Sequence, residues 1–383
     1  MTLLSAGAVA IDGRLCRPGW VRTAGRRILA CGAGAPPAVA DADFPDSIVV
    51  PGFVDMHVHG GAGASFCDAD AARVAAAARF HQRHGTTTML ASLVTAAPEP
   101  LLCAVRALTE ATRLGTVAGI HLEGPWLSRA RCGAHDPEWT RAPDPAEIDA
   151  LLAAADGTIR MVTLAPELPG STKAIRRLRD AGVVVAVGHT DATYQQTTRA
   201  LALGASVGTH LCNAMAPLHH REPGPVLALL ADPRVTVEII ADGVHVHPDV
   251  VRAVIGAAGP HRVALVTDAI AAAGHGDGGY RLGPVEIEVR GGVARVAGTS
   301  TIAGGTATMD RLFRAVAGAG GSRTDDALLA AVQMTSATPA RALGLDGVGA
   351  LRSGYDANLV VLDQDLRVSA VMANGDWRVR AGG

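Results

Sequence analysis

The stretch PGFVDMHVHG, residues 51–60, is an apolar run that ends in two histidines. Pro51 and Gly52 open the run, and His57 and His59 stand two positions apart near its end. In a β-strand such positions share a face, so both imidazoles can point at one ion. A solvated pair on the surface is an equally good interpretation of this spacing taken alone. The runs that follow along the chain indicate which fold the stretch begins.

Eight apolar runs rich in β-branched residues follow one another from this stretch onward. They cover residues 48–57, 86–93, 117–122, 159–164, 183–188, 206–211, 235–241 and 263–267. Segments with helical spacing separate most of them, at 70–84, 98–114, 145–155, 171–181 and 194–203. Near-continuous apolar strands that alternate with helices indicate parallel strands buried on both faces. Eight of them predict an α/β fold with a (β/α)8 TIM-type barrel rather than a doubly wound sheet.

The two ends of the chain have a different pattern, with short strand-like pieces separated by turns. Asn374-Gly375 is a strong hairpin signal near the carboxyl end. Neither end can form a core alone, so we expect residues 1–48 and 346–383 to pair into one small β-sandwich domain. The barrel then occupies residues 49–345. A further hairpin is predicted at 283–297, with its turn at Gly291-Gly292.

Composition argues against several classes of partner. The chain has 383 residues, of which 49% are apolar, and a formal net charge of -2. Such a balance argues against binding nucleic acid or a membrane surface through bulk charge. The six cysteines have no paired spacing, which predicts free thiols in a reducing compartment. We see no signal-peptide pattern and no run of 18 apolar residues, so we expect a cytoplasmic protein without a transmembrane helix.

Acidic and imidazole side chains also end three of the later runs. Glu123 ends the third in HLEGP, His189 the fifth in GHTDA and His210 the sixth in GTHLCNAM. Singly, Glu123 also fits a turn residue or helix cap, and each histidine fits an ordinary polar group. Because the carboxyl ends of barrel strands meet on one face, we expect the three to converge. One carboxylate and two imidazoles suit a divalent ion that keeps an open position.

A further carboxylate, Asp268, ends the eighth run in VALVTDAI. At the same barrel face it is placed to take a proton from a metal-activated water and to return it to a leaving group. The alternative is an N-cap for a helix at 269–273. Zn²⁺ is the ion that we expect first, and the ligand types suit Fe²⁺, Mn²⁺ or Co²⁺ as well.

Several motifs together resemble those of one known family. PGFVDMHVHG, HLEGPWLS, GHTDATYQQ, GTHLCNAMAPLHHREPG, ADGVHVHP, LVTDAIAAAG and IAGGTATM, with the tail TSATPARALGLDGVGALRSGYDANLVVLD, are similar to the N-acetylglucosamine-6-phosphate deacetylase family of the amidohydrolase superfamily. The likeness spans residues 48–365, and HLEGP, HLxNAM and ADGxH are its most specific segments. It implies a barrel with an appended β-sandwich, and a homodimer.

The resemblance also implies roles for individual residues. Glu123, His189 and His210 match the principal metal ligands. Asp268 matches the catalytic acid/base, and His245 the group that polarises the acetamide carbonyl. The positions that match substrate contacts are Ala134, His135, Asn213, Ala214, Arg221, His245, Ile302, Ala303 and Gly304. Arg221 is expected to contact phosphate because its planar fork matches phosphate oxygens, with a salt bridge inside its loop as the alternative.

Whether the site holds one ion or two depends on His57 and His59, because the resemblance includes members with and without this pair. Many amidohydrolases bridge two ions with a carboxylated lysine at the end of the fourth strand. Here the fourth run ends in Leu-Ala-Pro at 164–166, and Lys173, the one lysine of the chain, lies further on in a predicted helix. Glu123 is then the evident bridging carboxylate, so one or two ions are expected.

The expected reaction is hydrolysis of the acetamide of N-acetyl-D-glucosamine 6-phosphate, by metal-bound hydroxide with Asp268 as general base and acid. The alternatives are N-acetylgalactosamine 6-phosphate as substrate, another amidohydrolase acting on a cyclic or acyl amide, a deaminase, and a non-catalytic barrel. One loop residue carries a separate hypothesis. Cys132, in SRARCGAHD, is either an idle loop cysteine or a thiolate that approaches the metal.

Overall fold

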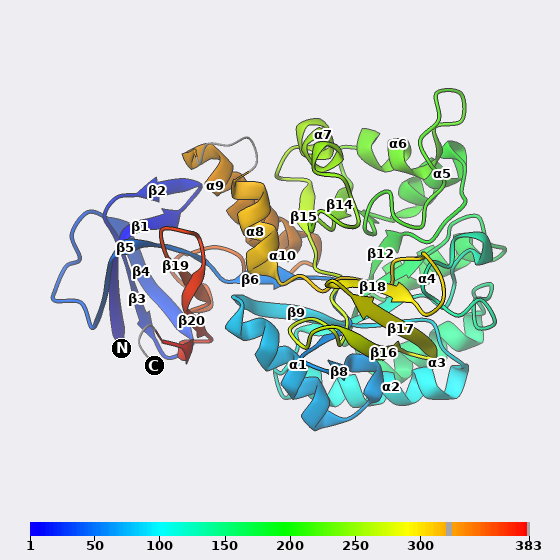
Figure 1. The fold of residues 1–383 in the computed structure, drawn as a ribbon, viewed down its shortest axis with the longest axis horizontal. Helices are drawn as coiled ribbons and strands as arrows, with labels where there is room; N and C mark the ends of the chain where they lie inside the picture. The colour runs from blue at the N-terminus through cyan, green and yellow to red at the C-terminus, as the bar shows by residue number, and fades with distance from the viewer. Residues whose placement is uncertain (319–323, 381–383) are drawn as a thin grey trace. The chain divides into compact units, whose positions relative to one another are not determined.

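The computed structural model describes residues 1–318 and 324–380 of the chain. These residues form two eight-stranded sheets, one three-stranded sheet and one two-stranded hairpin (Figure 1). They divide into two compact units. One comprises Met1–Asp55, His81–Thr88 and the chain from Thr308 onward, and the other comprises Met56–Phe80 and Met89–Ala307. The predicted domain boundaries at residues 48 and 346 stay a prediction.

One eight-stranded sheet is the predicted parallel barrel. Its strands are β6 (Phe53–Asp55), β9 (Thr86–Leu93), β10 (Gly119–Glu123), β11 (Ile159–Leu164), β12 (Val184–Val187), β13 (Val207–Gly208), β14 (Thr236–Ile239) and β15 (Val263–Leu265). They pair in chain order from β6 to β15. Beyond the strand ends, the amide N–H of Asp268 donates to His57 O at 2.9 Å, and that of His59 donates to Ala269 O at 2.8 Å. These bonds join the last strand's end to the first, so the (β/α)8 fold is confirmed.

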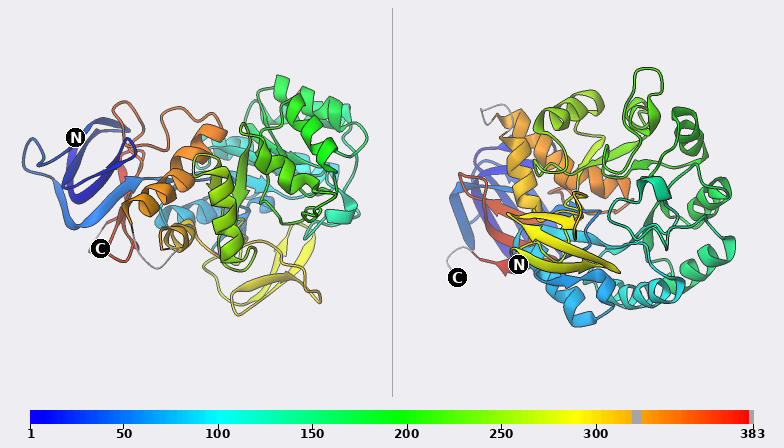
Figure 2. Two further views of the ribbon diagram at one scale, coloured as in Figure 1. Left: turned by 90° about the horizontal axis from the view of Figure 1, so that it is seen from above. Right: turned by 45° about the vertical axis from the view of Figure 1, so that its right-hand side comes forward.

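Helices follow the barrel strands and lie around them (Figure 2). They are α1 (Ala71–Arg83), α2 (Pro98–Arg113), α3 (Pro145–Ala155), α4 (Ser171–Asp180), α5 (Tyr194–Leu203), α6 (Gly224–Ala231) and α7 (Pro248–Ala258). Local sequence explains where several begin. Asp144 caps α3 ahead of Pro145, and Thr193 and Gln196 form a capping box on α5. In α4, Ile175 and Leu178 are buried, as the helical spacing predicts.

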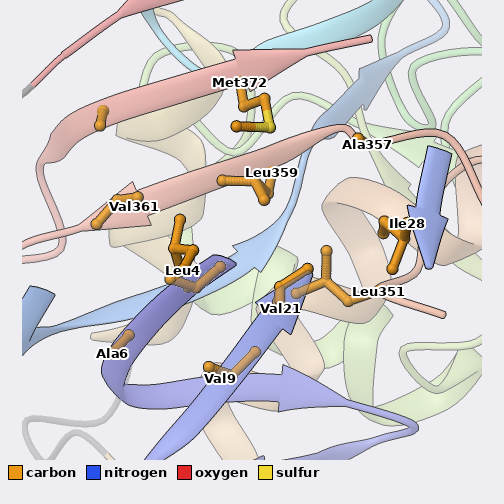
Figure 3. Packing of buried hydrophobic residues seen from close by; sticks show 12 residues of the cluster. Leu4, Ala6, Val9, Val21, Ile28, Leu351, Ala357, Leu359, Val361 and Met372 are labelled. Atoms are coloured by element: carbon orange, nitrogen blue, oxygen red, sulfur yellow. The ribbon is translucent and has the colours of Figure 1, made fainter. Parts of the chain in front are cut away.

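The second eight-stranded sheet is built from both ends of the chain. Its strands are β1 (Thr2–Ile11), β2 (Arg14–Cys16), β3 (Gly19–Ala24), β4 (Arg27–Ala33), β5 (Ala42–Pro51), β19 (Leu359–Leu362), β20 (Val368–Ala373) and β21 (Asp376–Val379). β1 pairs with β5 in parallel, and the other neighbours are antiparallel. Leu4 and Val9 from one end share a buried cluster with Leu359 and Met372 from the other (Figure 3). This confirms the small β-domain.

The hairpin predicted at Asn374-Gly375 is confirmed between β20 and β21. Both residues have positive φ, 54° and 84°, which a two-residue turn of this type requires. A Cβ on Gly375 would lie 1.8 Å from Gly25 O, so only glycine fits beside that backbone.

The strand predicted over 48–57 is wrong as one element. β5 ends at Pro51, and β6 begins at Phe53 in the barrel sheet. Gly52 makes the change possible, because a Cβ there would lie 2.1 Å from Thr87 Oγ1. Its amide still pairs with Asn358 O at 2.9 Å, whereas the next amide pairs with Gly85 O. One apolar run therefore serves two sheets, and a pattern of apolar residues cannot mark that division.

The predicted hairpin after the eighth strand is present and has a third strand. β16 (Gly278–Leu282), β17 (Val285–Arg290) and β18 (Val293–Val296) form an antiparallel sheet. Asp277 accepts hydrogen bonds from both amides of the Gly291-Gly292 turn, at 2.6 and 2.9 Å. The short strands β7 (Gly60–Gly61) and β8 (Ala64–Ser65) form a separate hairpin.

Helices α8 (Met309–Ala317), α9 (Asp325–Val332) and α10 (Thr338–Ala342) lie near the carboxyl end of the chain. A π-helical turn, Gln333–Ala337, joins the last two. Within residues 1–318 and 324–380, none of the helices has the combined length and apolarity that crossing a bilayer requires.

Candidate metal centre

Glu123 is the centre of a buried cluster at the carboxyl end of the barrel strands. It is the last residue of β10, and its exposed fraction is 3%. Its Oε1 lies 3.0 Å from His189 Nε2 and 2.9 Å from His210 Nε2. Gly124 then turns the chain away at φ 87°, where a Cβ would lie 2.4 Å from Thr95 Oγ1. The turn leaves the carboxylate facing inward.

His57 and His59 approach the same carboxylate from the other side. His57 and His59 follow β6 rather than lying within it, yet their Nε2 atoms are 3.1 Å apart. His57 Nε2 lies 3.4 Å from Glu123 Oε1, and His59 Nε2 lies 3.2 Å from Glu123 Oε2. The two carboxylate oxygens of Glu123 thus stand between two pairs of imidazoles.

His189 and His210 both adopt positive φ, 46° and 25°, which costs free energy in residues other than glycine. Neighbouring groups hold His189 there. His189 O accepts from the amide of Ser128 at 2.9 Å, and its Nδ1 donates to Arg131 O at 2.9 Å. That bond leaves the Nε2 lone pair free to point at an ion. Strained backbone of this kind is typical of functional sites.

The donor set fits a divalent ion in chemistry and in spacing. Among residues 1–318 and 324–380, two groups bring their donor atoms within 4.8 Å of one another: His57, His59 and Glu123, and Glu123, His189 and His210. Tetrahedral coordination with metal–ligand bonds near 2 Å separates neighbouring donors by about 3.3 Å. The donor-to-donor distances given above, from 2.9 to 3.4 Å, are close to this value. Glu123 belongs to both groups, as a bridging carboxylate would.

The charges of the cluster also favour a cation. Burial acts to raise the pKa of Glu123, but His57, His135 and His189 outweigh it and hold that pKa well below its usual range. Burial acts to lower the pKa of His57, and the carboxylates of Glu123 and Glu238 reverse the effect and raise it. An anionic centre of this kind attracts positive charge, which a divalent ion supplies.

Asp268 lies beside this cluster, three residues after the end of β15. Its Oδ1 is 3.2 Å from His59 Nε2 and 3.6 Å from His57 Nε2. Burial acts to raise its pKa, but hydrogen bonding to His59 and the nearby charges lower it to about 2. The carboxylate is therefore ionised and able to accept a proton. Residues 269–273 form a bridge and turns rather than a helix, so the helix-cap interpretation of Asp268 is wrong.

His245 is oriented by a carboxylate that sequence reasoning did not assign. Its Nδ1 donates to Asp242 Oδ2 at 2.8 Å, and its amide N–H donates to Asp242 Oδ1 at 2.9 Å. Burial acts to lower the pKa of His245, but Asp242 and the charge of Asp268 raise it. The ring is thus held with Nε2 available as a hydrogen-bond donor. The run IIADG at 239–243 gave the signal, a carboxylate directly after the seventh strand.

His135, expected to contact substrate, lies against the central carboxylate. Its Nε2 is 3.2 Å from Glu123 Oε2, and its Nδ1 accepts from the amide of Thr95 at 3.1 Å. Because Nδ1 is an acceptor, Nε2 carries the proton and donates to Glu123. Burial lowers the pKa of His135 to about 4. Ala134, beside it, packs against a core cluster.

Of the other expected substrate positions, some are linked to residues of the buried cluster and one is exposed. Asn213 Nδ2 donates to His210 O at 3.1 Å, and Ala214 O accepts from Thr190 N. The segment Ile302, Ala303 and Gly304 leads to Gly305, whose amide donates to Asp268 O at 2.6 Å. Arg221 is exposed, and its Nη1 lies 2.8 Å from His220 Nε2 rather than at the buried cluster.

Cys132 is half-buried and follows a short 3-10 turn, and its backbone O accepts from the amide of His135. Burial raises the pKa of its thiol. The two metal-capable groups in the described part of the chain do not include it. All six cysteines have free thiols.

Two fully buried polar residues near the cluster were missed in the sequence. Glu238 on β14 accepts at Oε2 from His57 Nδ1, at 3.0 Å. His121 on β10 lies between Ser92 Oγ at 2.9 Å and Thr163 Oγ1 at 2.8 Å. A charged or imidazole side chain inside an apolar strand was the available signal, and for His121 its i,i+2 spacing to Glu123 placed it on the same face.

Comparison with known proteins places these residues in context. The Amidohydrolase family profile matches residues 48–378. One similar solved structure is that of a mutant of N-acetyl-D-glucosamine-6-phosphate deacetylase from Mycobacterium smegmatis, in complex with N-acetyl-D-glucosamine-6-phosphate. Its sequence is 55% identical to this chain, and the two structures superimpose with a TM-score of 0.97 over 99% of both chains.

Two curated relatives are more distant. N-acetylgalactosamine-6-phosphate deacetylase of Escherichia coli O157:H7 is 40% identical to this chain, and the match covers 86% of this chain and 87% of that protein. N-acetylglucosamine-6-phosphate deacetylase of Bos taurus is 39% identical, over 88% of this chain and 85% of that protein.

Proposed function

This chain belongs to the amidohydrolase family, and from that premise we propose that it hydrolyses N-acetyl-D-glucosamine 6-phosphate to glucosamine 6-phosphate and acetate. One observation carries the proposal. The buried carboxylate of Glu123 stands between two pairs of imidazoles, with the ionised Asp268 beside them. The 55% identical relative, whose structure contains N-acetyl-D-glucosamine-6-phosphate, supports the choice of substrate.

The family and the donor set indicate a divalent metal cofactor. We propose Glu123, His189 and His210 as ligands of one ion, and His57, His59 and Glu123 as ligands of a second. Zn²⁺ is the proposed ion, because imidazole and carboxylate donors at these spacings suit it. A divalent ion bound there would lower the pKa of a water molecule and polarise an acyl oxygen.

The chain's own residues supply the proton transfers. Asp268 accepts a proton from the attacking water, because its pKa of about 2 keeps it a carboxylate at neutral pH. It then donates that proton to the amine nitrogen as the carbon–nitrogen bond breaks. Gly305 holds the backbone of Asp268 through its amide, which fixes where the carboxylate points.

His245 is proposed to donate from Nε2 to the acetyl oxygen as negative charge develops on it. The hydrogen bond from Nδ1 to Asp242 and the raised pKa of the ring favour the protonated, donating form. A donor fixed before the reaction contributes a large part of the stabilisation of an oxyanion.

Arg221 is proposed to bind the substrate phosphate. Its exposed position beside His220 leaves the guanidinium accessible to an anion. We also propose a homodimer in the cytoplasm, which the likeness to the deacetylases supports.

The test is acetate release from N-acetylglucosamine 6-phosphate by the wild type and by Asp268→Asn, each with its metal content measured. Asn cannot accept the proton, so we expect kcat to fall about 100-fold to 10,000-fold with the metal content unchanged. A near-wild-type kcat at equal metal content would remove Asp268 from the mechanism.

N-acetylgalactosamine 6-phosphate is the second candidate substrate, because the relative with 40% identity carries that name. The two sugars differ at one hydroxyl group, so kcat/KM with each decides between them. A higher kcat/KM for the galactosamine compound would reassign the substrate and leave the chemistry unchanged.

A further inference from the structure

Glu238 is a buried carboxylate with no role in the proposed reaction. It lies in the middle of β14, and its exposed fraction is 0%. Burying a carboxylate costs several kcal/mol unless hydrogen bonds or opposite charges compensate. Its Oε1 has no hydrogen-bond partner among the described residues, so Oε2 carries the interactions that hold it.

Both hydrogen bonds of Oε2 go to candidate metal ligands. His57 Nδ1 donates to it at 3.0 Å, and the amide N–H of His210 donates to it at 3.1 Å. One carboxylate oxygen therefore joins a histidine that follows the first barrel strand to a histidine that follows the sixth.

The bond to His57 determines which ring nitrogen faces the ion. With its Nδ1 proton donated to Glu238, His57 has its Nε2 lone pair directed toward Glu123 Oε1 and His59 Nε2. A carboxylate behind a ligating histidine fixes its tautomer and orientation and makes it a stronger donor. The His121 ring packs edge-on against His57, with centroids 4.5 Å apart, and restricts the same ring sterically.

We infer that Glu238 is the positioning residue of His57, and that it sets the affinity for the ion shared by His57, His59 and Glu123. The inference rests on the proposed ligation by these three residues. The ion of Glu123, His189 and His210 is affected less, because Glu238 contacts that group through a backbone amide and not through a ligating ring. Glu238 thus determines whether the chain holds one ion or two.

The experiment counts and titrates metal in the full-length chain. Metal-free wild type, Glu238→Ala, Glu238→Gln and His57→Ala are titrated with Zn²⁺ against a competing chelator, and the bound ions are counted by mass spectrometry. We expect two ions in the wild type. In Glu238→Ala we expect one retained ion and a second bound about 10-fold to 100-fold more weakly. Gln keeps the volume and an acceptor oxygen, so Glu238→Gln loses less.

The double variant His57→Ala/Glu238→Ala tests the pathway of the effect. If Glu238 acts through His57, the second substitution causes no further loss of metal once His57 is absent. Thr236→Val is the matched control. Thr236 lies two residues earlier on β14, on the same face and buried, so it reports damage to the strand. We expect it to bind two ions with wild-type affinity.

Two outcomes would overturn the inference. One is that both Glu238 variants bind Zn²⁺ as the wild type does. The other is that His57→Ala holds as many ions as the wild type. Acetate release, measured in parallel, separates this from the proposed function. Loss of one ion in Glu238→Ala without acetate release by the wild type would disprove the substrate and support the inference. Acetate release by the wild type, together with unaltered metal binding in Glu238→Ala, would support the proposed function and overturn the inference.

Discussion

At the scale of single residues, the site is organised by pairs in which a carboxylate fixes an imidazole. Glu238 does this for His57, and Asp242 does it for His245. In each pair the carboxylate accepts a hydrogen bond from Nδ1, so Nε2 is the nitrogen left to bind an ion or the substrate. The two rings nonetheless have opposite tasks, since a ligand needs a lone pair on Nε2 and an electrophile needs a proton there.

Asp242→Asn tests the second pair. Without the carboxylate, the raised pKa of His245 falls, because Asp242 is a principal cause of that rise. His245 then loses its proton at a lower pH, so the alkaline limb of the kcat profile moves to lower pH. We expect kcat at neutral pH to fall about 10-fold to 100-fold, less than for outright removal of a donor. The measurement is kcat from pH 5 to 10, and an unmoved alkaline limb would contradict it.

At the scale of elements, helix α8 is fixed by a buried carboxylate in its first turn. Asp310 accepts from Arg314 Nη1 at 2.7 Å and contacts His84 Nδ1 at 3.3 Å and Thr308 Oγ1 at 2.5 Å. Burial acts to raise its pKa, but these three partners lower it to about 2. The side chain of Asp310 is 9% exposed, whereas those of Arg314 and His84 are 28% and 37% exposed, so solvent screens these interactions only in part.

Asp310 therefore predicts an acid-dependent stability. A folded-state pKa below the unfolded value gives stability that is present above about pH 4 and is lost as the pH falls toward 2. The shift corresponds to about 2 kcal/mol. Asp310→Asn should lose about that much free energy of unfolding at pH 7. Between pH 4 and pH 2 its free energy of unfolding should fall less than that of the wild type.

Urea unfolding at several pH values measures this effect. Asp325→Asn is the matched control, because Asp325 is also in the first turn of a helix and pairs with an arginine, but both partners are exposed. Exposed pairs contribute little. Equal losses in the two variants would show that burial of Asp310 is not the cause.

At the scale of the whole molecule, the sequence predicted the barrel and the ends of its strands well. Eight buried parallel strands each leave an apolar run, and a polar residue at the end of a run stands out. Glu238 and the division at Gly52 were not predictable in this way. The partner of Glu238 is 181 residues away, and the run at 48–57 serves two sheets, so each depends on contacts between distant segments.

The ligands of the proposed ions come from four separate barrel strands, so metal should stabilise the barrel as a whole. A ligand at about 100 times its Kd adds about 2.7 kcal/mol to the folded state. Removal of metal by a chelator should then lower Tm by about 3 °C for each ion lost, and Zn²⁺ should restore it. Differential scanning calorimetry on chelated and reloaded protein measures this shift.

Two double variants separate ligation from a general effect of zinc on histidines. His189→Ala/His210→Ala removes two proposed ligands, so its Tm should respond much less to chelator. His219→Ala/His220→Ala removes two exposed imidazoles from a loop and should respond as the wild type does. If the chelator strips the ions and the wild-type Tm stays in place, the cluster binds metal without tying its strands together, and the left-handed backbone of His189 and His210 is held by its hydrogen bonds alone.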